Sequence, residues 1–116
     1  MPNDIAAFKA RLAHEVVPFA DTLALIGSLY RYTPTAFSNG LGEDALHSAA
    51  GMNEGSCKVF AFATLQGLSL DETLACFGEH YQAVLADPAG SGHPNIRLFM
   101  RDGWAGIRFE GTPLVS

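Results

Sequence analysis

The stretch NEGSCKVFAFATLQGL, residues 53–68, decides how this 116-residue chain folds. After its first polar positions the stretch is apolar on almost every side of a helix, and a helix of that kind is buried. Asn53 or Ser56 supplies a cap at its start. We therefore expect a helix from about Ser56 to Gly67 at the centre of the core, with Phe60 almost entirely buried.

Helical patterns also lie on both sides of this central stretch. Apolar residues recur at helical spacing in four further segments, and the third of these opens with the capping-box sequence Ser69-Leu70-Asp71-Glu72. The expected helices cover about residues 4–13, 18–30, 69–87 and 94–102. The last of them is expected to turn Ile96, Phe99 and Met100 inward. Residues 41–50 have only a weak pattern, which allows a short helix there.

Two segments favour extended structure instead of helix. Tyr32 to Phe37 is rich in aromatic and β-branched residues, and Trp104 to Glu110 alternates between apolar and polar positions at its end. Pro34 cannot donate a ladder hydrogen bond, so the first segment belongs at a sheet edge. The sequence therefore predicts an α+β fold: a mostly helical single domain over residues 1–116, with about five helices around a central buried helix and a small two-stranded antiparallel sheet.

Composition excludes several classes of protein. The chain is 48% hydrophobic with a net charge of −5, and this negative charge opposes binding to nucleic acid or to anionic membranes. The N-terminus lacks the pattern of a signal peptide, and no apolar run approaches the roughly 18 residues that span a bilayer. Two cysteines are too few for a disulfide framework. We expect a cytoplasmic protein.

Four blocks in one order resemble the HopJ type III effector family over about Phe19 to Leu114. They are YRYTPTAFSNG, AGMNEGSCKVFAFA, TLACFGEHY and HPNIRLFMRDGWAGIRFEG. The resemblance implies a single small domain and a bacterial origin, and it implies no defined biochemical activity. The family name also implies delivery by a type III secretion system. However, the helical pattern begins within a few residues of Met1, where an exported effector usually has a flexible polar segment.

Cys57 is the candidate nucleophile. A thiol in the first turn of a helix lies at the positive end of the helix dipole, which can lower its pKa. His93 or His80 would serve as the base in such a site, with Asn53 or Asn95 orienting the imidazole. The alternative is that Cys57 is a small residue packed at the start of the buried helix, and free cysteines are commonly of this kind.

A binding site is the other candidate. The turn at Asn53 and Glu54 can offer backbone N–H groups to an anion, although Glu54 opposes a phosphate there. Tyr32 and Trp104 could line an aromatic groove beside Arg97, suited to a small anionic ligand or a peptide. Each of these features also has a purely structural explanation, as a helix cap, a core aromatic residue or a surface ion pair.

We expect no metal or other cofactor, because the four histidines are dispersed and no metal-binding motif is present. The leading hypothesis is a soluble HopJ-type binding or interaction protein with an unidentified protein or small-molecule partner. The alternative is a small cysteine-dependent enzyme using Cys57 with His93 or His80. An unpaired strand edge would also invite formation of a homo-oligomer.

Overall fold

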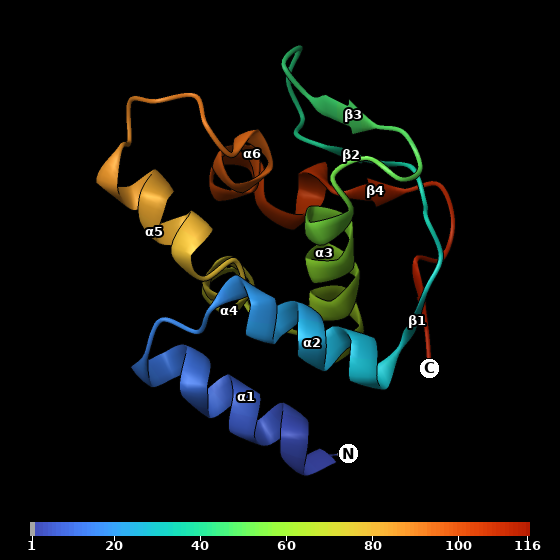
Figure 1. Ribbon diagram of the computed structural model, residues 1–116. Coiled ribbons are helices and arrows are strands. Elements are labelled where there is room, and N and C mark those ends of the chain that lie inside the picture. Colours follow the sequence, from blue (N-terminus) through green and yellow to red (C-terminus); the bar gives the residue numbers. More distant parts are fainter. Residues whose placement is uncertain (1) are drawn as a thin grey trace.

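The structure, a computed structural model, describes residues 2–116, with side chains from Ile5 onward (Figure 1). Within these residues the chain folds into one α+β unit of six α-helices, a short 3-10 helix and five short strands, as the sequence predicts in outline. The elements are α1 (Pro2–His14), α2 (Phe19–Leu29), β1 (Arg31–Tyr32), β2 (Phe37–Asn39), β3 (Leu46–Ser48), α3 (Glu54–Gln66), α4 (Leu70–Ala75), α5 (Glu79–Ala86), α6 (Pro94–Asp102), η1 (Gly103–Gly106), β4 (Arg108–Phe109) and β5 (Leu114–Val115).

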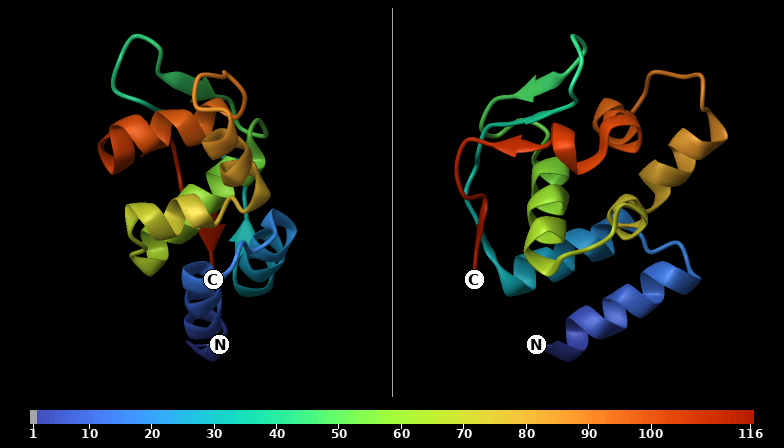
Figure 2. Two further views of the ribbon diagram at one scale, coloured as in Figure 1. Left: turned by 90° about the vertical axis from the view of Figure 1, so that its left-hand side faces the viewer. Right: turned by 180° about the vertical axis from the view of Figure 1, so that it is seen from behind.

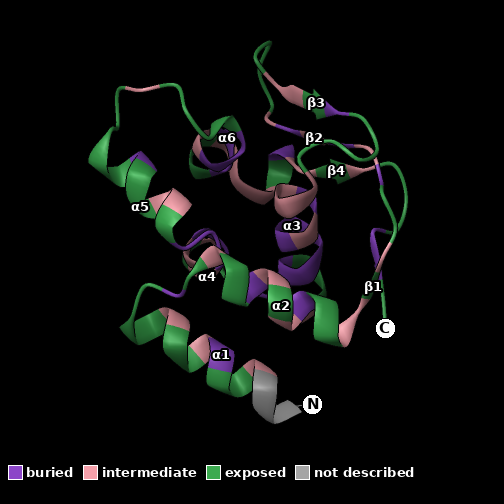
Figure 3. Ribbon diagram, in the orientation of Figure 1, coloured by how far each residue is buried: buried purple, intermediate pink, exposed green. Residues whose placement is uncertain are grey.

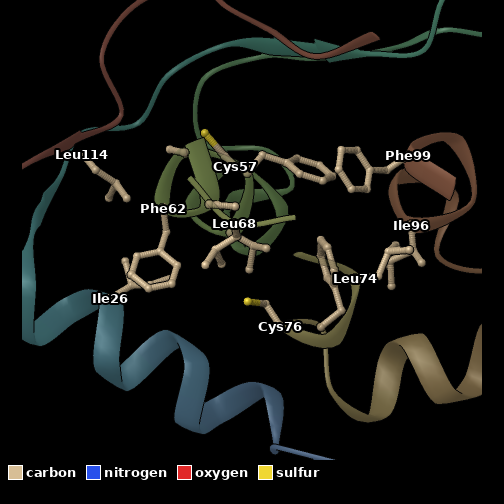
Figure 4. Packing of buried hydrophobic residues seen from close by; sticks show 14 of the residues in the cluster. Ile26, Cys57, Phe62, Leu68, Leu74, Cys76, Ile96, Phe99 and Leu114 are labelled. Atoms are coloured by element: carbon tan, nitrogen blue, oxygen red, sulfur yellow. The ribbon is translucent and has the colours of Figure 1, made fainter. Parts of the chain in front are cut away.

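Helix α3 forms the centre of the core, as its apolar sequence predicts. Phe60 is fully buried, and its ring meets those of Phe77 and Phe99 with centroids 5.6 and 5.0 Å away. The helix is buried on several sides: Figure 4 shows Phe62 turned toward Ile26 of α2, and Phe99 of α6 pointing toward α3 from another side. Figure 3 shows the contrast with α1 and α5, whose outer faces are exposed.

The strands form two small sheets, and the sequence predicted only one. Strand β2 lies between β3 and β4 in an antiparallel sheet, with Phe37 opposite Phe109. Strand β1 pairs instead with β5, so the C-terminal end of the chain lies beside the segment that follows α2 (Figure 2). Pro34 separates β1 from β2 because it has no N–H to donate to a continuous ladder.

The short helix allowed for residues 41–50 is wrong, because Leu46–Ser48 forms β3. Strand β3 pairs with β2, and this pairing overrides the weak local preference for a helix. Trp104 was expected to begin the second extended segment, but the strand observed there, β4, covers only Arg108–Phe109. Trp104 lies in the 3-10 turn η1, and its ring packs edge-on against Phe99 with centroids 5.0 Å apart.

The helix expected over residues 69–87 is divided into α4 and α5. The capping box at Ser69 and Glu72 is formed as predicted. The division falls at Gly78, whose φ is 57°. A Cβ atom at this position would lie 2.2 Å from the Val17 carbonyl oxygen, so only glycine lets the chain pass so close to the segment before α2.

Helix α6 turns Asn95, Ile96, Leu98 and Phe99 into the protein. Met100 was expected to face inward, but it is 39% exposed. At about 100° per residue, Met100 lies at the edge of the inward face, on the side of Ile96 that is farther from Asn95 and Phe99, and it is therefore only partly covered. No helix in residues 2–116 is long and apolar enough to cross a membrane.

Candidate functional site

Four helices begin around one pocket of about 320 Å³. These are α2, α3, α5 and α6, whose first residues are Phe19, Glu54, Glu79 and Pro94. Figure 1 shows α5 and α6 on one side of this region and the start of α3 on the other. The pocket is lined by Phe19, Asn53, Gly55, Ser56, Phe77, His80, His93, Pro94, Asn95 and Ile96.

Helices α3 and α6 begin in the same way. Each follows a non-glycine residue with left-handed backbone, Asn53 with φ 52° and His93 with φ 55°. Neither side chain caps its helix; that of Asn53 donates from Nδ2 to Ser48 Oγ at 2.9 Å. The first N–H groups of a helix have no partner within the helix. Those of Gly55 and Ser56 also donate to no other backbone group in the described part of the chain.

Asn95 places a side-chain amide at the wall of the pocket, although only 5% of the residue is exposed. Its position is set by Asn39 on β2, which is fully buried. Asn39 Nδ2 donates to the main-chain oxygen of Asn95 at 2.8 Å and to its Oδ1 at 3.0 Å. Asn95 Nδ2 donates no hydrogen bond to any residue of the described chain.

Aromatic rings form the apolar part of the pocket. Phe19 and Phe77 stack with an interplanar angle of 8° and centroids 5.9 Å apart. The His80 ring stands edge-on to Phe19, and its centroid lies 4.9 Å from that of His93. Gly55 permits this arrangement, because a Cβ atom there would lie 2.9 Å from Cζ of Phe19.

The acidic residues in the first turns of α3 and α5 are Glu54 and Glu79, and both lie outside the pocket lining. Glu79 Oε1 accepts a hydrogen bond from the Phe19 N–H at 2.8 Å, and this bond lowers the pKa of Glu79. Glu54 lies beside Tyr32, and burial of the phenol together with this carboxylate raises the pKa of Tyr32. Neither carboxylate lines the pocket.

The structure places Cys57 apart from this pocket. Its thiol is buried and lies 3.7 Å from the Thr35 carbonyl oxygen, in the segment between β1 and β2. Figure 4 shows Cys57 pointing toward that strand side of α3. Burial is the main reason that the pKa of Cys57 rises to about 11, and Glu54 adds to it. His80 and His93 line the pocket without it, so catalysis through Cys57 stays a prediction that no contact here supports.

The predicted binding residues are only partly brought together. Asn53 and Asn95 line the pocket. Arg97 instead donates to the carbonyl oxygens of Gly92 and Pro88, which fastens the loop between α5 and α6. Trp104 is partly buried and packs against the core.

Tyr32 lies on another side of α3. The Lys58 ammonium stands over its ring, 4.6 Å from the centroid. The aromatic groove expected from Tyr32, Trp104 and Arg97 is therefore not assembled in this structure. The sequence analysis did not identify Phe19 and Phe77 as residues of the pocket, or Asn39 as the residue that positions Asn95. Among the described residues, no group of three or more histidine, cysteine or acidic side chains is placed to hold a metal ion.

Comparison with known proteins identifies the family. The model of the HopJ type III effector protein family matches residues 5–114. The chain belongs to the HopJ family. A solved structure described as the crystal structure of unknown function protein VPA0580 is similar to this HopJ domain, with 42% sequence identity and a TM-score of 0.85. The match covers 95% of this chain and 91% of that one. No curated protein matches the chain.

Proposed function

We propose that this HopJ domain is a binding protein for a small molecule, and that the pocket at the four helix starts is its binding site. The observation that carries the proposal is the meeting of apolar rings with hydrogen-bond donors that the protein itself leaves unused. Small-molecule sites are typically concave and mostly apolar, with a few polar groups that fix the ligand's orientation. The volume of about 320 Å³ lies at the small end of such sites.

Binding fits the geometry better than cysteine catalysis does. A nucleophile needs a base within hydrogen-bond reach, and the Cys57 thiol faces a main-chain carbonyl oxygen in a different place from the paired imidazoles. The high pKa of this thiol also leaves little thiolate at neutral pH.

The test is a screen of small organic fragments by amide chemical shifts in NMR. We expect bound fragments to shift the amide signals of Gly55, Ser56 and Asn95. Ser56→Leu adds bulk at the pocket wall and should abolish these shifts, whereas Ser28→Leu on the exposed face of α2 should preserve them. Shifts that map elsewhere, or that survive in Ser56→Leu, would overturn the proposal, and so would a screen without a single binder.

We further propose that the domain acts in the cytoplasm of the cell that makes it. Both cysteines are free and buried, which suits a reducing compartment. Fusion to a translocation reporter tests this location. Delivery of the fusion into a host cell by a type III secretion system would contradict it and favour the effector role that the family name describes.

A further inference from the structure

Three donors with no protein partner converge on the pocket from two helices. The main-chain N–H groups of Gly55 and Ser56 stand at the start of α3, and Asn95 Nδ2 comes from the first turn of α6. Helix starts carry a partial positive charge, equivalent to roughly half an elementary charge. Free N–H groups at such an end favour an anionic ligand.

The direction of the Asn95 amide is fixed independently of these helix ends. Asn39 Nδ2 donates to the main-chain oxygen of Asn95, and that oxygen can only accept. The same nitrogen also meets the end of the Asn95 side chain at 3.0 Å, so that end must be the oxygen. The NH₂ group is therefore the end left without a partner, on a residue that is 95% buried and lines the pocket.

This NH₂ group is not among the buried side-chain atoms that lack a partner, so it reaches the pocket's surface, where water or a ligand can accept its hydrogen bonds. The surroundings limit the charge of such a ligand. No lysine or arginine lines the pocket. Besides the amides, its lining offers the Ser56 hydroxyl and the imidazoles of His80 and His93 as hydrogen-bonding groups. The carboxylates of Glu54 and Glu79 stand at two of the same helix starts. These groups suit a single negative charge and oppose a phosphate dianion.

The remaining lining determines the body of the ligand. Phe19, Phe77 and Ile96 offer an apolar surface, and Pro94 adds to it. A ring or branched alkyl group would be buried against these side chains while its charged end meets the amides. The pocket's volume of about 320 Å³ suits a molecule with one such group.

We infer that the ligand is a small monocarboxylic acid with a compact aromatic or branched apolar body. Its carboxylate accepts hydrogen bonds from Gly55 N, Ser56 N and Asn95 Nδ2, and its apolar body lies against Phe19 and Phe77. This inference rests on the proposed function, because it names the class of ligand for the same pocket.

Calorimetric titration with four probes tests the inference: benzoate, cyclohexanecarboxylate, the neutral amide benzamide, and inorganic phosphate. Hydrogen bonds to a charged acceptor are roughly twice as strong as those between neutral groups. We therefore expect the two carboxylates to bind about tenfold or more tightly than benzamide and phosphate.

Ser56→Asp separates binding from folding. An acidic residue in the first turn of α3 favours the helix, so the melting temperature should hold or rise. The same carboxylate repels an anion in the pocket, so benzoate affinity should fall about tenfold or more. Asn95→Asp keeps the oxygen that faces Asn39 and replaces the free NH₂ group, and it should weaken benzoate by a similar factor. Gln82→Glu adds equal charge on the exposed face of α5 and should leave the affinity unchanged.

Two results would overturn the inference in different ways. Equal binding of benzamide and benzoate would remove the preference for an anion, yet it would leave a small-molecule pocket in place. Tighter binding of phosphate than of benzoate would assign the wrong class of anion. If none of the four probes binds and the fragment screen also finds no binder, the inference and the proposed function fall together.

Discussion

Asn39 on β2 and Asn95 on α6 are joined by two hydrogen bonds from a single amide nitrogen. One bond reaches the main-chain oxygen of Asn95 and the other its side-chain oxygen, at 2.8 and 3.0 Å. The pair fixes the start of α6 to the middle strand of the sheet. It also explains why a polar residue occupies an inward position of α6, since the main-chain and side-chain oxygens of Asn95 both find a donor there.

Replacing this donor should be strongly destabilising. Asn39→Asp removes the N–H groups and sets a carboxylate against two oxygen acceptors in a fully buried position. A buried charge without a partner costs roughly 3 to 5 kcal/mol, so we expect a loss of that size in urea unfolding at pH 7. Gln82→Glu makes the same chemical change on an exposed residue and should alter stability by less than about 0.5 kcal/mol. Similar values for the two variants would show that the Asn39 bonds contribute little.

Two glycines should respond to alanine with opposite signs. Gly78→Ala places a Cβ atom 2.2 Å from the Val17 carbonyl oxygen, on a residue with φ of 57°. We expect it to destabilise the fold by about 2 kcal/mol or more, from strain at a special backbone conformation and from overpacking. Gly27 is exposed within α2, and a Cβ atom there meets nothing within 4 Å. Gly27→Ala should therefore stabilise the protein by about 0.5 to 1 kcal/mol.

Thermal or urea unfolding of these two variants gives the signs directly. If Gly78→Ala is as stable as the wild type, the chain can separate α5 from the segment before α2 without loss. The close approach that divides α4 from α5 would then not be required for the fold.

Phe60→Ala tests the central position of α3. The ring is fully buried against other aromatic rings, so its loss removes transfer energy and leaves a cavity, with a cost of about 3 to 5 kcal/mol. Gln82→Ala on α5 is the exposed control and should change the free energy of unfolding by less than about 0.5 kcal/mol. Equal effects of the two substitutions would mean that the core is centred elsewhere.

The sequence predicts what depends on neighbouring positions. Apolar residues on all sides of residues 56–67 are enough to predict a buried helix, and the spacing of Ser69 and Glu72 is enough to predict a capping box. The side-chain cap expected from Asn53 or Ser56 is not formed, because the first is the N-cap residue and its side chain donates to Ser48 Oγ instead.

The pocket was beyond such reasoning because its parts come from distant segments. Asn39 and Asn95 are 56 positions apart, and nothing in either local pattern points to the other. Phe19 and Phe77 are similarly far apart in the sequence, and each fits the pattern of an ordinary core residue. The division at Gly78 was missed for a related reason, since it depends on the approach of Val17 and not on the helical spacing around it.

Cys57 should be unreactive in the folded protein. Its thiol is fully buried, and burial raises its pKa to about 11, while Cys76 is raised to about 12 by the same cause. We expect alkylation of the native protein at pH 8 to be slow and limited by unfolding, and rapid alkylation in urea. Fast labelling of native Cys57, with a midpoint below pH 9, would instead support the cysteine-dependent enzyme.

The same thiol should make the protein less stable in alkali. Below about pH 9 the thiol is protonated in both the folded and the unfolded chain, so its ionisation does not affect stability. Between about pH 9 and pH 11 the Cys57 thiol ionises only in the unfolded chain, because its pKa in the folded protein is about 11. The free energy of unfolding must therefore fall as pH rises through this window. Urea unfolding at a series of pH values should show a smaller decline in Cys57→Ala than in the wild type, and parallel declines would mean that the buried thiol titrates normally.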